Sequence, residues 1–247
     1  MAIPCYLAMT AAEMEKSEGL PKNAGWMACH FSQSSQGVTN LPHSLPPGSL
    51  LMLDDAAPVS GHDPALVEAQ LREAMARFSC AGILLDFQRP EQEESAAMAR
   101  ELCQRLSGLV TVSAAYAQSL SCPVCLPPVP CSVPLPEYLA PWKGREIWLE
   151  GALTKEEWAI TPEGAFRREV FGTPLPARGF REKELHCHYQ MSKEEDCLLF
   201  TLWRRSEDLE SLIAAAESNG VTAMAGLWQE LGELPPRSLR GGQVALP

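Results

Sequence analysis

Three apolar runs decide the fold, and they read SLLMLDD (residues 49–55), AGILLDF (81–87) and LVTVSAAY (109–116). Between the first two, Asp63-Pro64 supplies a helix N-cap and a first helical residue, and apolar residues follow at helical spacing. Between the second and third, the same spacing extends from about Glu91 to Leu106 and stops before Gly108. The order is therefore strand, helix, strand, helix, strand. Strands that are apolar almost throughout are typical of a parallel sheet covered on both faces, so the sequence predicts an α/β fold.

Further strands are predicted on both sides of this region. The candidates are residues 4–9, 26–32, 145–150, 185–191, 197–204 and 221–228, with a hairpin within 158–170. Residues 122–141 contain seven prolines and are expected to form a loop with one helical turn. Ser206 is expected to cap a helix that ends at Asn219-Gly220.

This pattern favours a single (β/α)8 barrel over residues 1–232, trimmed of some helices and followed by a C-terminal tail, residues 233–247. An open doubly wound sheet is the alternative. The first strand is not followed by a glycine-rich turn, which argues against a sheet of the dinucleotide-binding kind, and no cofactor is predicted.

Composition and charge narrow the expected partners. The chain has 247 residues, 46% of them hydrophobic and 21% charged, which is typical of a globular protein. A net charge of −11 repels phosphate backbones, so nucleic acid is not an expected partner. Neither a bilayer-spanning apolar run nor a secretory signal is recognised, so no membrane partner is expected. The nine cysteines are scattered, which indicates reduced thiols in the cytoplasm, and the spacing that includes Cys122-x-x-Cys125 predicts no metal site.

In a parallel barrel the functional site lies at the carboxyl ends of the strands. The candidate ligand-binding residues at those ends are Asp54, Asp55, Asp86, Gln88, Tyr116, Glu150, Gln190 and Trp228. Carboxylates, amides and aromatic rings at one rim suit a carbohydrate, because a sugar offers hydroxyl groups to polar side chains and an apolar face to a flat ring. The sequence therefore predicts a carbohydrate or another small polar ligand.

The run AGILLDFQRP (residues 81–90) resembles the fourth-strand motif of family 18 glycoside hydrolases, the group of chitinases and spore-cortex-lytic enzymes. That motif reads Asp-x-x-Asp-x-Asp-x-Glu. Residues 203–209 resemble the penultimate strand of those barrels leading into its helix. Residues 220–232 resemble the last strand, which in the family ends in a tryptophan beneath the sugar, here Trp228.

In this family the last glutamate of the motif protonates the leaving glycosidic oxygen, and the aspartate two residues earlier orients the acetamido group of the substrate. Residues two apart on a strand point the same way, so Asp86 and Gln88 are both expected to face the barrel mouth. Asp86 keeps the aspartate, whereas Ala81, Leu84 and Gln88 depart from the motif. An amide cannot deliver a proton at neutral pH, so the family mechanism cannot run as written.

Three functions remain open at this point. The first is a non-catalytic barrel that binds a glycan or related ligand at the strand ends. The second is an active glycosidase or other hydrolase with relocated carboxylates, in which Asp86 works with Glu150 or Asp55. The third is a structural barrel with no ligand, which an apolar and filled mouth would favour.

Overall fold

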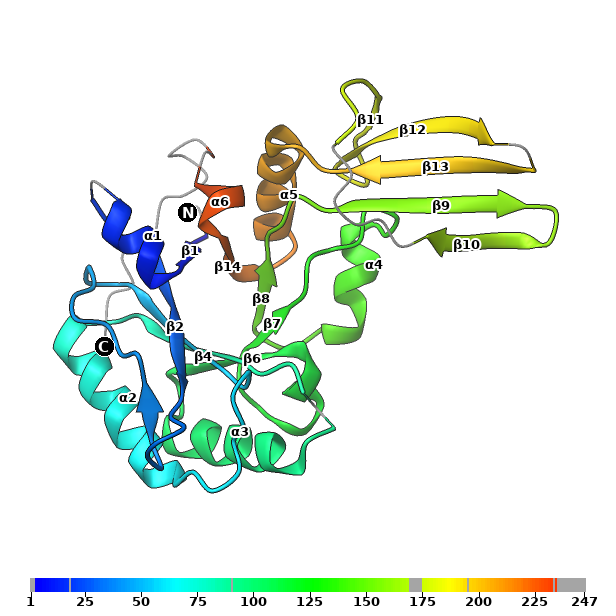
Figure 1. Cartoon of the computed structure of the whole chain (residues 1–247). Coiled ribbons are helices and arrows are strands. Elements are labelled where there is room, and N and C mark those ends of the chain that lie inside the picture. The colour runs from blue at the N-terminus through cyan, green and yellow to red at the C-terminus, as the bar shows by residue number, and fades with distance from the viewer. Residues whose placement is uncertain are drawn as a thin grey trace.

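The fold is built around a closed barrel of eight parallel strands (Figure 1). The computed structural model describes residues 3–17, 19–89, 91–168, 175–194, 196–232 and 234. The barrel strands are β1 (Cys5–Met9), β2 (Ala24–Phe31), β4 (Leu50–Asp54), β5 (Gly82–Asp86), β6 (Val110–Ser113), β7 (Val124–Leu126), β8 (Ile147–Glu150) and β14 (Val221–Leu227). Each strand pairs in parallel with the next in this order, and β14 pairs with β1 to close the ring. The predicted (β/α)8 barrel is confirmed, and the open sheet is excluded.

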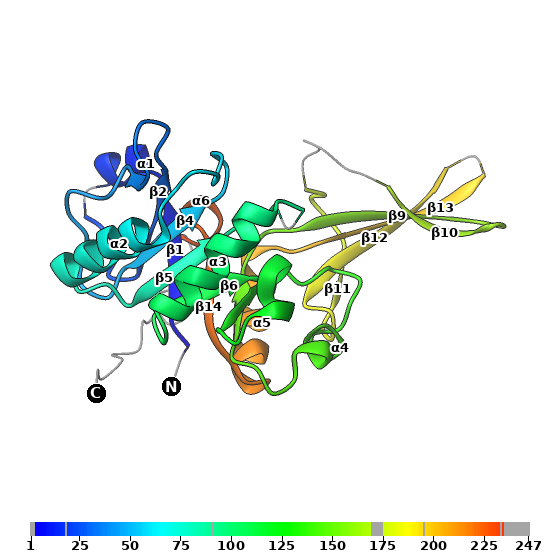
Figure 2. The same cartoon turned by 90° about the horizontal axis from the view of Figure 1, so that it is seen from below.

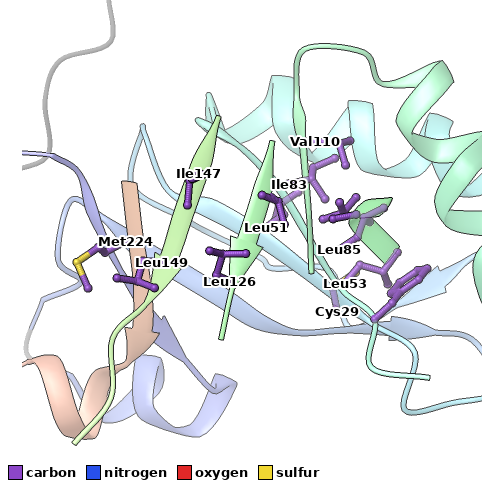
Figure 3. Packing of buried hydrophobic residues seen from close by; sticks show 14 of the residues in the cluster. Cys29, Leu51, Leu53, Ile83, Leu85, Val110, Leu126, Ile147, Leu149 and Met224 are labelled. Atoms are coloured by element: carbon purple, nitrogen blue, oxygen red, sulfur yellow. The ribbon is translucent and has the colours of Figure 1, made fainter. Parts of the chain in front are cut away.

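Alternation along each strand divides the apolar side chains between two layers. The inner cluster consists of Tyr6, Ala8, Leu50, Met52, Leu84, Ala223 and Ala225. Positions between these, such as Leu51, Leu53, Ile83 and Leu85, point outward and form the larger core beneath the helices (Figure 3). Both faces of the strands are therefore buried, which explains why the sequence runs that encode them are apolar almost throughout.

Helices cover the outside of the barrel unevenly. The helices α2 (Pro64–Phe78), α3 (Glu93–Arg105) and α5 (Ser206–Ser218) bury apolar faces in the outer core. The helices α1 (Ala11–Lys16), α4 (Leu135–Leu139) and α6 (Trp228–Leu231) and the 3-10 helices η1 (Ala114–Ser119) and η2 (Ala140–Trp142) are short. The barrel is thus trimmed of long outer helices at several places, as predicted. Within the described residues, no helix has the length and apolar character needed to cross a membrane.

A second, antiparallel sheet is inserted between β8 and α5. Its strands are β9 (Lys155–Thr161), β10 (Gly164–Arg168), β11 (Phe180–Glu182), β12 (Cys187–Glu194) and β13 (Cys197–Trp203), in the spatial order β10-β9-β13-β12-β11. Its long strands project away from the barrel in both views (Figures 1 and 2). A short strand β3 (Val38–Thr39) pairs antiparallel with the end of β2.

The inserted sheet corrects one expectation. Residues 203–209 do not contain the penultimate barrel strand, because Trp203 pairs with Lys155 and His188 in the inserted sheet. The penultimate barrel strand is β8. The single domain over residues 1–232 stays a prediction, and residues 235–247 of the predicted tail lie outside the described residues.

The proline-rich stretch 122–141 holds more structure than the expected loop. It contains β7, which is three residues long, and α4. Val124 donates its backbone N–H to Glu146, while the carbonyl of Pro123 accepts from Val112, so the flanking proline joins the sheet only as an acceptor. In α4, proline occupies the first turn, where its missing N–H leaves no helical bond unmade.

Candidate functional site

A cavity of about 340 Å³ opens at the carboxyl ends of the barrel strands. Its polar lining comes from Asp86, Gln88, Ser113 and Glu150, at the ends of β5, β6 and β8. The apolar part of the lining includes Ala8, Met27, Met52, Leu84, Cys125 and Leu227. Ligand sites in proteins typically measure about 300–1,000 Å³, so this cavity suits a small molecule or one end of a longer one.

Strand alternation places Asp86 and Gln88 in this cavity, as the sequence predicted. Leu84, two residues earlier, belongs to the inner cluster, so the two polar residues continue an inward-facing series. The Gln88 side-chain amide donates a hydrogen bond to Asp86 Oδ1. Burial raises the pKa of Asp86, the bond from Gln88 lowers it, and the negative charges of Asp54 and Asp55 raise it. The end of β5 therefore presents a carboxyl group held by a neighbouring amide.

Glu150 is the second carboxyl group in the cavity lining. Its side chain keeps contact with solvent at the mouth, but the surrounding protein removes much of its hydration. This desolvation raises the pKa of Glu150 from 4.5 to about 7, and the negative charges of Asp86 and Glu230 contribute to the shift. A carboxyl group with such a pKa is partly protonated at neutral pH, so it can donate as well as accept a proton.

Asp54 lies beside the cavity rather than in its lining. It is the direct partner of Asp86 in the register of β4 and β5, and its charge raises the pKa of Asp86. Asp54 Oδ2 is 2.7 Å from His30 Nδ1 on β2, and Asp54 Oδ1 accepts a hydrogen bond from the backbone of Ala56. The sequence did not single out His30, because its position next to Asp54 depends on the pairing of β2 with β4.

Asp55 and Tyr116 do not line the cavity. Asp55 is 2% exposed, and its two carboxylate oxygens accept hydrogen bonds from the backbone N–H groups of Gln88 and Arg89, at 2.8 and 3.1 Å. Tyr116 lies in the outer core, with its ring centroid 6.0 Å from that of Phe87, and burial raises its pKa to about 12. Asp55 follows the outward-facing Leu53 by two positions, so strand alternation turns it away from the ligand side.

Gln190 and Trp228 also lie elsewhere than expected. Gln190 is on β12 of the inserted sheet, opposite Thr201. Trp228 begins α6 and packs against the outer core, whereas Leu227 lines the cavity. The inward-facing positions of β14 are Ala225 and Leu227, so the next residue points away from the barrel interior. The expected tryptophan platform is therefore absent from the cavity lining that the structure describes.

Sequence reasoning missed Cys125 and Glu230 as site residues, and it named Ser113 as a polar residue at a strand end without making it a ligand-binding candidate. Cys125 on β7 lines the cavity, and burial raises the pKa of its thiol. Ser113 also lines it and donates a hydrogen bond to the carbonyl of Phe87. Glu230 acts on Glu150 through its charge and accepts a hydrogen bond from the backbone of Leu153 at 3.4 Å. The proline-rich setting of β7 hid the signal for Cys125. Across the described parts of the chain, no group of three His, Cys, Asp or Glu side chains could hold a metal ion.

Comparisons with solved structures find barrels of similar fold. The spore cortex-lytic enzyme of Bacillus cereus has a TM-score of 0.58 and 11% identity, covering 96% of this chain and 73% of that one. A family 18 N-acetylglucosaminidase from Paenibacillus barengoltzii has a TM-score of 0.55 and 10% identity, covering 96% and 97%. A family 18 chitinase from Cycas revoluta has a TM-score of 0.56 and 12% identity, covering 91% and 94%.

Sequence comparisons detect no such relationship: neither a family model nor a curated protein sequence matches the chain. The similarity to these proteins is therefore one of fold, and it lies in the closed barrel of parallel strands. The barrel of this chain is thus similar in fold to the barrels of family 18 glycoside hydrolases.

Proposed function

We propose that this protein binds a glycan built of N-acetylhexosamine units at the barrel mouth and does not hydrolyse it. The observation that carries the proposal is the pair Asp86 and Gln88. The amide of Gln88 lies in the cavity two residues after Asp86 and donates its hydrogen bond to that carboxylate. It can donate and accept hydrogen bonds to a sugar, but it holds no proton that it could transfer to a leaving oxygen.

Two further observations support binding. The cavity is open and partly polar, unlike the filled apolar mouth expected of a purely structural barrel. Two of the similar structures, chitinases from Cycas revoluta and tobacco, were solved as variants with one glutamate replaced by glutamine, in complex with N-acetylglucosamine tetramers. Because the described cavity lining contains no aromatic ring, we expect weak binding that depends on hydrogen bonds.

The test is a titration of the full chain with the N-acetylglucosamine tetramer, in which binding is measured by calorimetry or by ligand-observed NMR. We expect weak binding by the wild type, at least about tenfold weaker binding by Asp86→Asn, and no release of shorter oligomers. Glu163→Gln, in the turn between β9 and β10, is the matched control and should bind like the wild type. Equal binding by the wild type and Asp86→Asn, or none by either, would reject the proposed site.

The pKa of Glu150 favours one second candidate, an active hydrolase with a relocated acid. At a pKa of about 7, Glu150 could protonate a leaving oxygen while Asp86 acts as the second carboxyl group. This candidate predicts slow release of a fluorogenic group from N-acetylhexosamine glycosides. It also predicts loss of that activity in both Glu150→Gln and Asp86→Asn. Activity that survives Glu150→Gln would exclude Glu150 as the acid.

A further inference from the structure

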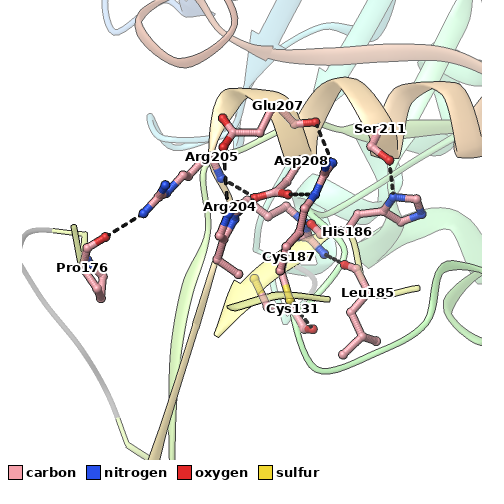
Figure 4. Close-up of polar contacts among 12 residues, drawn as sticks. Cys131, Pro176, Leu185, His186, Cys187, Arg204, Arg205, Glu207, Asp208 and Ser211 are labelled. Atoms are coloured by element: carbon pink, nitrogen blue, oxygen red, sulfur yellow. Dashed lines mark hydrogen bonds and ion pairs between the residues drawn. The ribbon is translucent and has the colours of Figure 1, made fainter. Parts of the chain in front are cut away.

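A pair of cysteines joins the inserted sheet to the barrel. Cys131 lies in the loop that follows β7, and Cys187 is the first residue of β12. Both side chains are fully buried, and all nine cysteines are free thiols in the structure. The Cys187 thiol donates to the carbonyl oxygen of Cys131, which lies 3.6 Å away (Figure 4), and the two thiols are near enough to shift each other's pKa. Two sulfur atoms from separate parts of the chain are therefore neighbours.

A buried arginine organises the surroundings of this pair. Arg204 is 1% exposed and donates to the carbonyl oxygens of Val129, Pro130, Leu185 and His186. It also donates to Thr154 Oγ1 at 3.0 Å. Among the described residues, no carboxylate forms an ion pair with Arg204. Its positive charge therefore acts on the nearby dipoles and thiols rather than being neutralised by direct contact.

Thr154 lies between Arg204 and the sulfur of Cys131 and contacts both. Its hydroxyl oxygen accepts from Arg204, so its hydrogen is available for Cys131 Sγ, which lies 3.1 Å away. The neighbouring Cys187 thiol is the main cause that lowers the pKa of Cys131; Arg204 and Thr154 lower it further, against burial and the charge of Glu156. The same contact raises the pKa of Cys187. Cys131 is thus the sulfur better suited to be a thiolate, and the thiolate is the nucleophilic form.

We propose that Cys131 and Cys187 form a reversible disulfide when the protein meets a hydroperoxide. Cys131 thiolate attacks one oxygen of hydrogen peroxide, the O–O bond breaks, and the leaving hydroxide takes a proton to become water. The Cys187 thiol then attacks the resulting sulfenic sulfur, the S–O bond breaks, and a second water leaves as the S–S bond forms. The two thiols together give two electrons to the peroxide, and an added dithiol returns them.

The disulfide would fasten the inserted sheet to the wall of the cavity. Pro127, which lines the cavity, lies four residues before Cys131 on the same loop. A buried thiol meets a small oxidant during local opening of the structure, and closing the bond would restrict that opening. This site lies outside the proposed glycan site, so its test is independent of glycan binding.

The experiment treats the reduced full chain with a few equivalents of hydrogen peroxide and blocks remaining thiols after unfolding. Mass spectrometry of the digest then reports which cysteines are joined. We expect the Cys131–Cys187 link to form before any other, to be reversed by dithiothreitol, and to be lost in Cys131→Ser and Cys187→Ser. Thr154→Val keeps the side-chain shape but removes the hydroxyl, so it should slow the link several-fold. Thr222→Val, at the start of β14, is the matched control and should leave the rate unchanged.

Cys103 and Cys122 form an internal reference. The Cys122 thiol raises the pKa of Cys103, and both residues line a second cavity of about 400 Å³ at the opposite end of the barrel. Burial and the contact with Cys122 raise the pKa of Cys103, so this pair should react more slowly despite its access to solvent. The proposal is overturned if the Cys103–Cys122 link forms while Cys131 and Cys187 stay reduced. It is also overturned if the Cys131–Cys187 link appears only in denaturant.

Discussion

Asp55 and Asp86 are carboxylates at the ends of neighbouring strands, and strand alternation gives them different tasks. Asp86 faces the cavity, while Asp55 is buried and accepts two backbone N–H groups at the end of β5. The sequence identified both residues as candidates because both follow apolar runs. The sequence could not show which of the two side chains faces the cavity. That depends on which positions of β4 face inward, and the sequence does not fix where β4 ends. A one-residue shift exchanges the two faces.

Removing the Asp55 carboxylate should destabilise the fold. In Asp55→Ala the N–H groups of Gln88 and Arg89 lose their acceptor, and an unsatisfied buried polar group costs about 1–3 kcal/mol. We therefore expect the free energy of unfolding, measured by urea denaturation, to fall by about 2–4 kcal/mol. Asp54→Ala is the control and should cost about 1 kcal/mol or less, because Asp54 is partly exposed. Equal losses in the two variants would contradict the assigned role of Asp55.

Glu150 should make the stability of the protein depend on pH. Its pKa is about 7 in the folded protein and near 4.5 without the fold, so between these values the folded state holds a proton that the unfolded chain has released. The free energy of unfolding should therefore fall as the pH rises through this window. Glu150→Gln removes this contribution, and the difference in Tm between pH 5 and pH 8 should become smaller than in the wild type. Glu73→Gln, on the exposed face of α2, should leave that difference unchanged.

At the scale of elements, local signals identified strands and helices and the hairpin partners next to each other in the chain, but not the partners that lie further apart in sequence. The segments β4, α2, β5, α3 and β6 lie where the apolar runs and helical spacing placed them. The strands β12 and β13 were also recognised, but their pairing with β9 and β11 in a separate sheet was not. Strand propensity reflects a half-buried pleated surface, and it does not specify which strand will lie alongside.

Very short strands could not be predicted from the pattern of apolar and polar residues. The strand β7 has three residues and is flanked by prolines, so no alternation could be counted. It holds its place because Val124 and Cys125 pair with β6 and β8, an interaction between segments that are distant in sequence. The same limit hid the cavity position of Cys125, whereas Trp228 was expected in the lining, in place of Leu227, because of the family resemblance.

The N-cap of α2, which the sequence predicted from Asp63-Pro64, can be tested directly. Asp63 Oδ1 accepts the backbone N–H of Ala65 at 2.9 Å, and Pro64 follows as the first helical residue. Asp63→Ala should lower the free energy of unfolding by about 1 kcal/mol, because an orphan N–H of the first turn loses its acceptor. Asp63→Asn keeps an acceptor and should stay within a few tenths of a kcal/mol of the wild type. Urea denaturation measures both, and a neutral Asp63→Ala would show that the cap contributes nothing here.

At the scale of the whole molecule, one side chain connects the barrel to the inserted sheet. Arg204 follows β13 directly and reaches the loop after β7, the segment before β9 and the residues that precede β12. These segments are far apart in sequence, and all their bonds to the guanidinium are made by neutral oxygens. The fixed fork of an arginine suits such a set of acceptors, and the three donors of a lysine cannot reproduce it.

Arg204→Lys should therefore loosen the inserted sheet. We expect the free energy of unfolding to fall by at least about 2 kcal/mol, because several buried carbonyl groups lose their donor. Hydrogen exchange of the backbone amides in β12 and β13 should accelerate more than exchange in β4 and β5. Arg205→Lys is the neighbouring control, since Arg205 donates to the carbonyl groups of Pro176 and Ala177 only through its tip at 3.1 Å. Uniform acceleration across the barrel strands would argue against a local role at the junction.

Closure of the ring by β14 has a consequence for the nascent chain. The strand β14 lies between β1 and β8, and more than fifty residues of inserted sheet and helix are synthesised after β8 before β14 emerges from the ribosome. During that interval β1 and β8 each present an unpaired strand edge, the kind of surface on which chains associate wrongly. The pairing of β1 with β14 also spans nearly the whole sequence, so its loop-closure entropy makes it a late and slow contact. Newly made copies of this protein therefore depend on dilution or on chaperones for longer than a barrel without the insertion would.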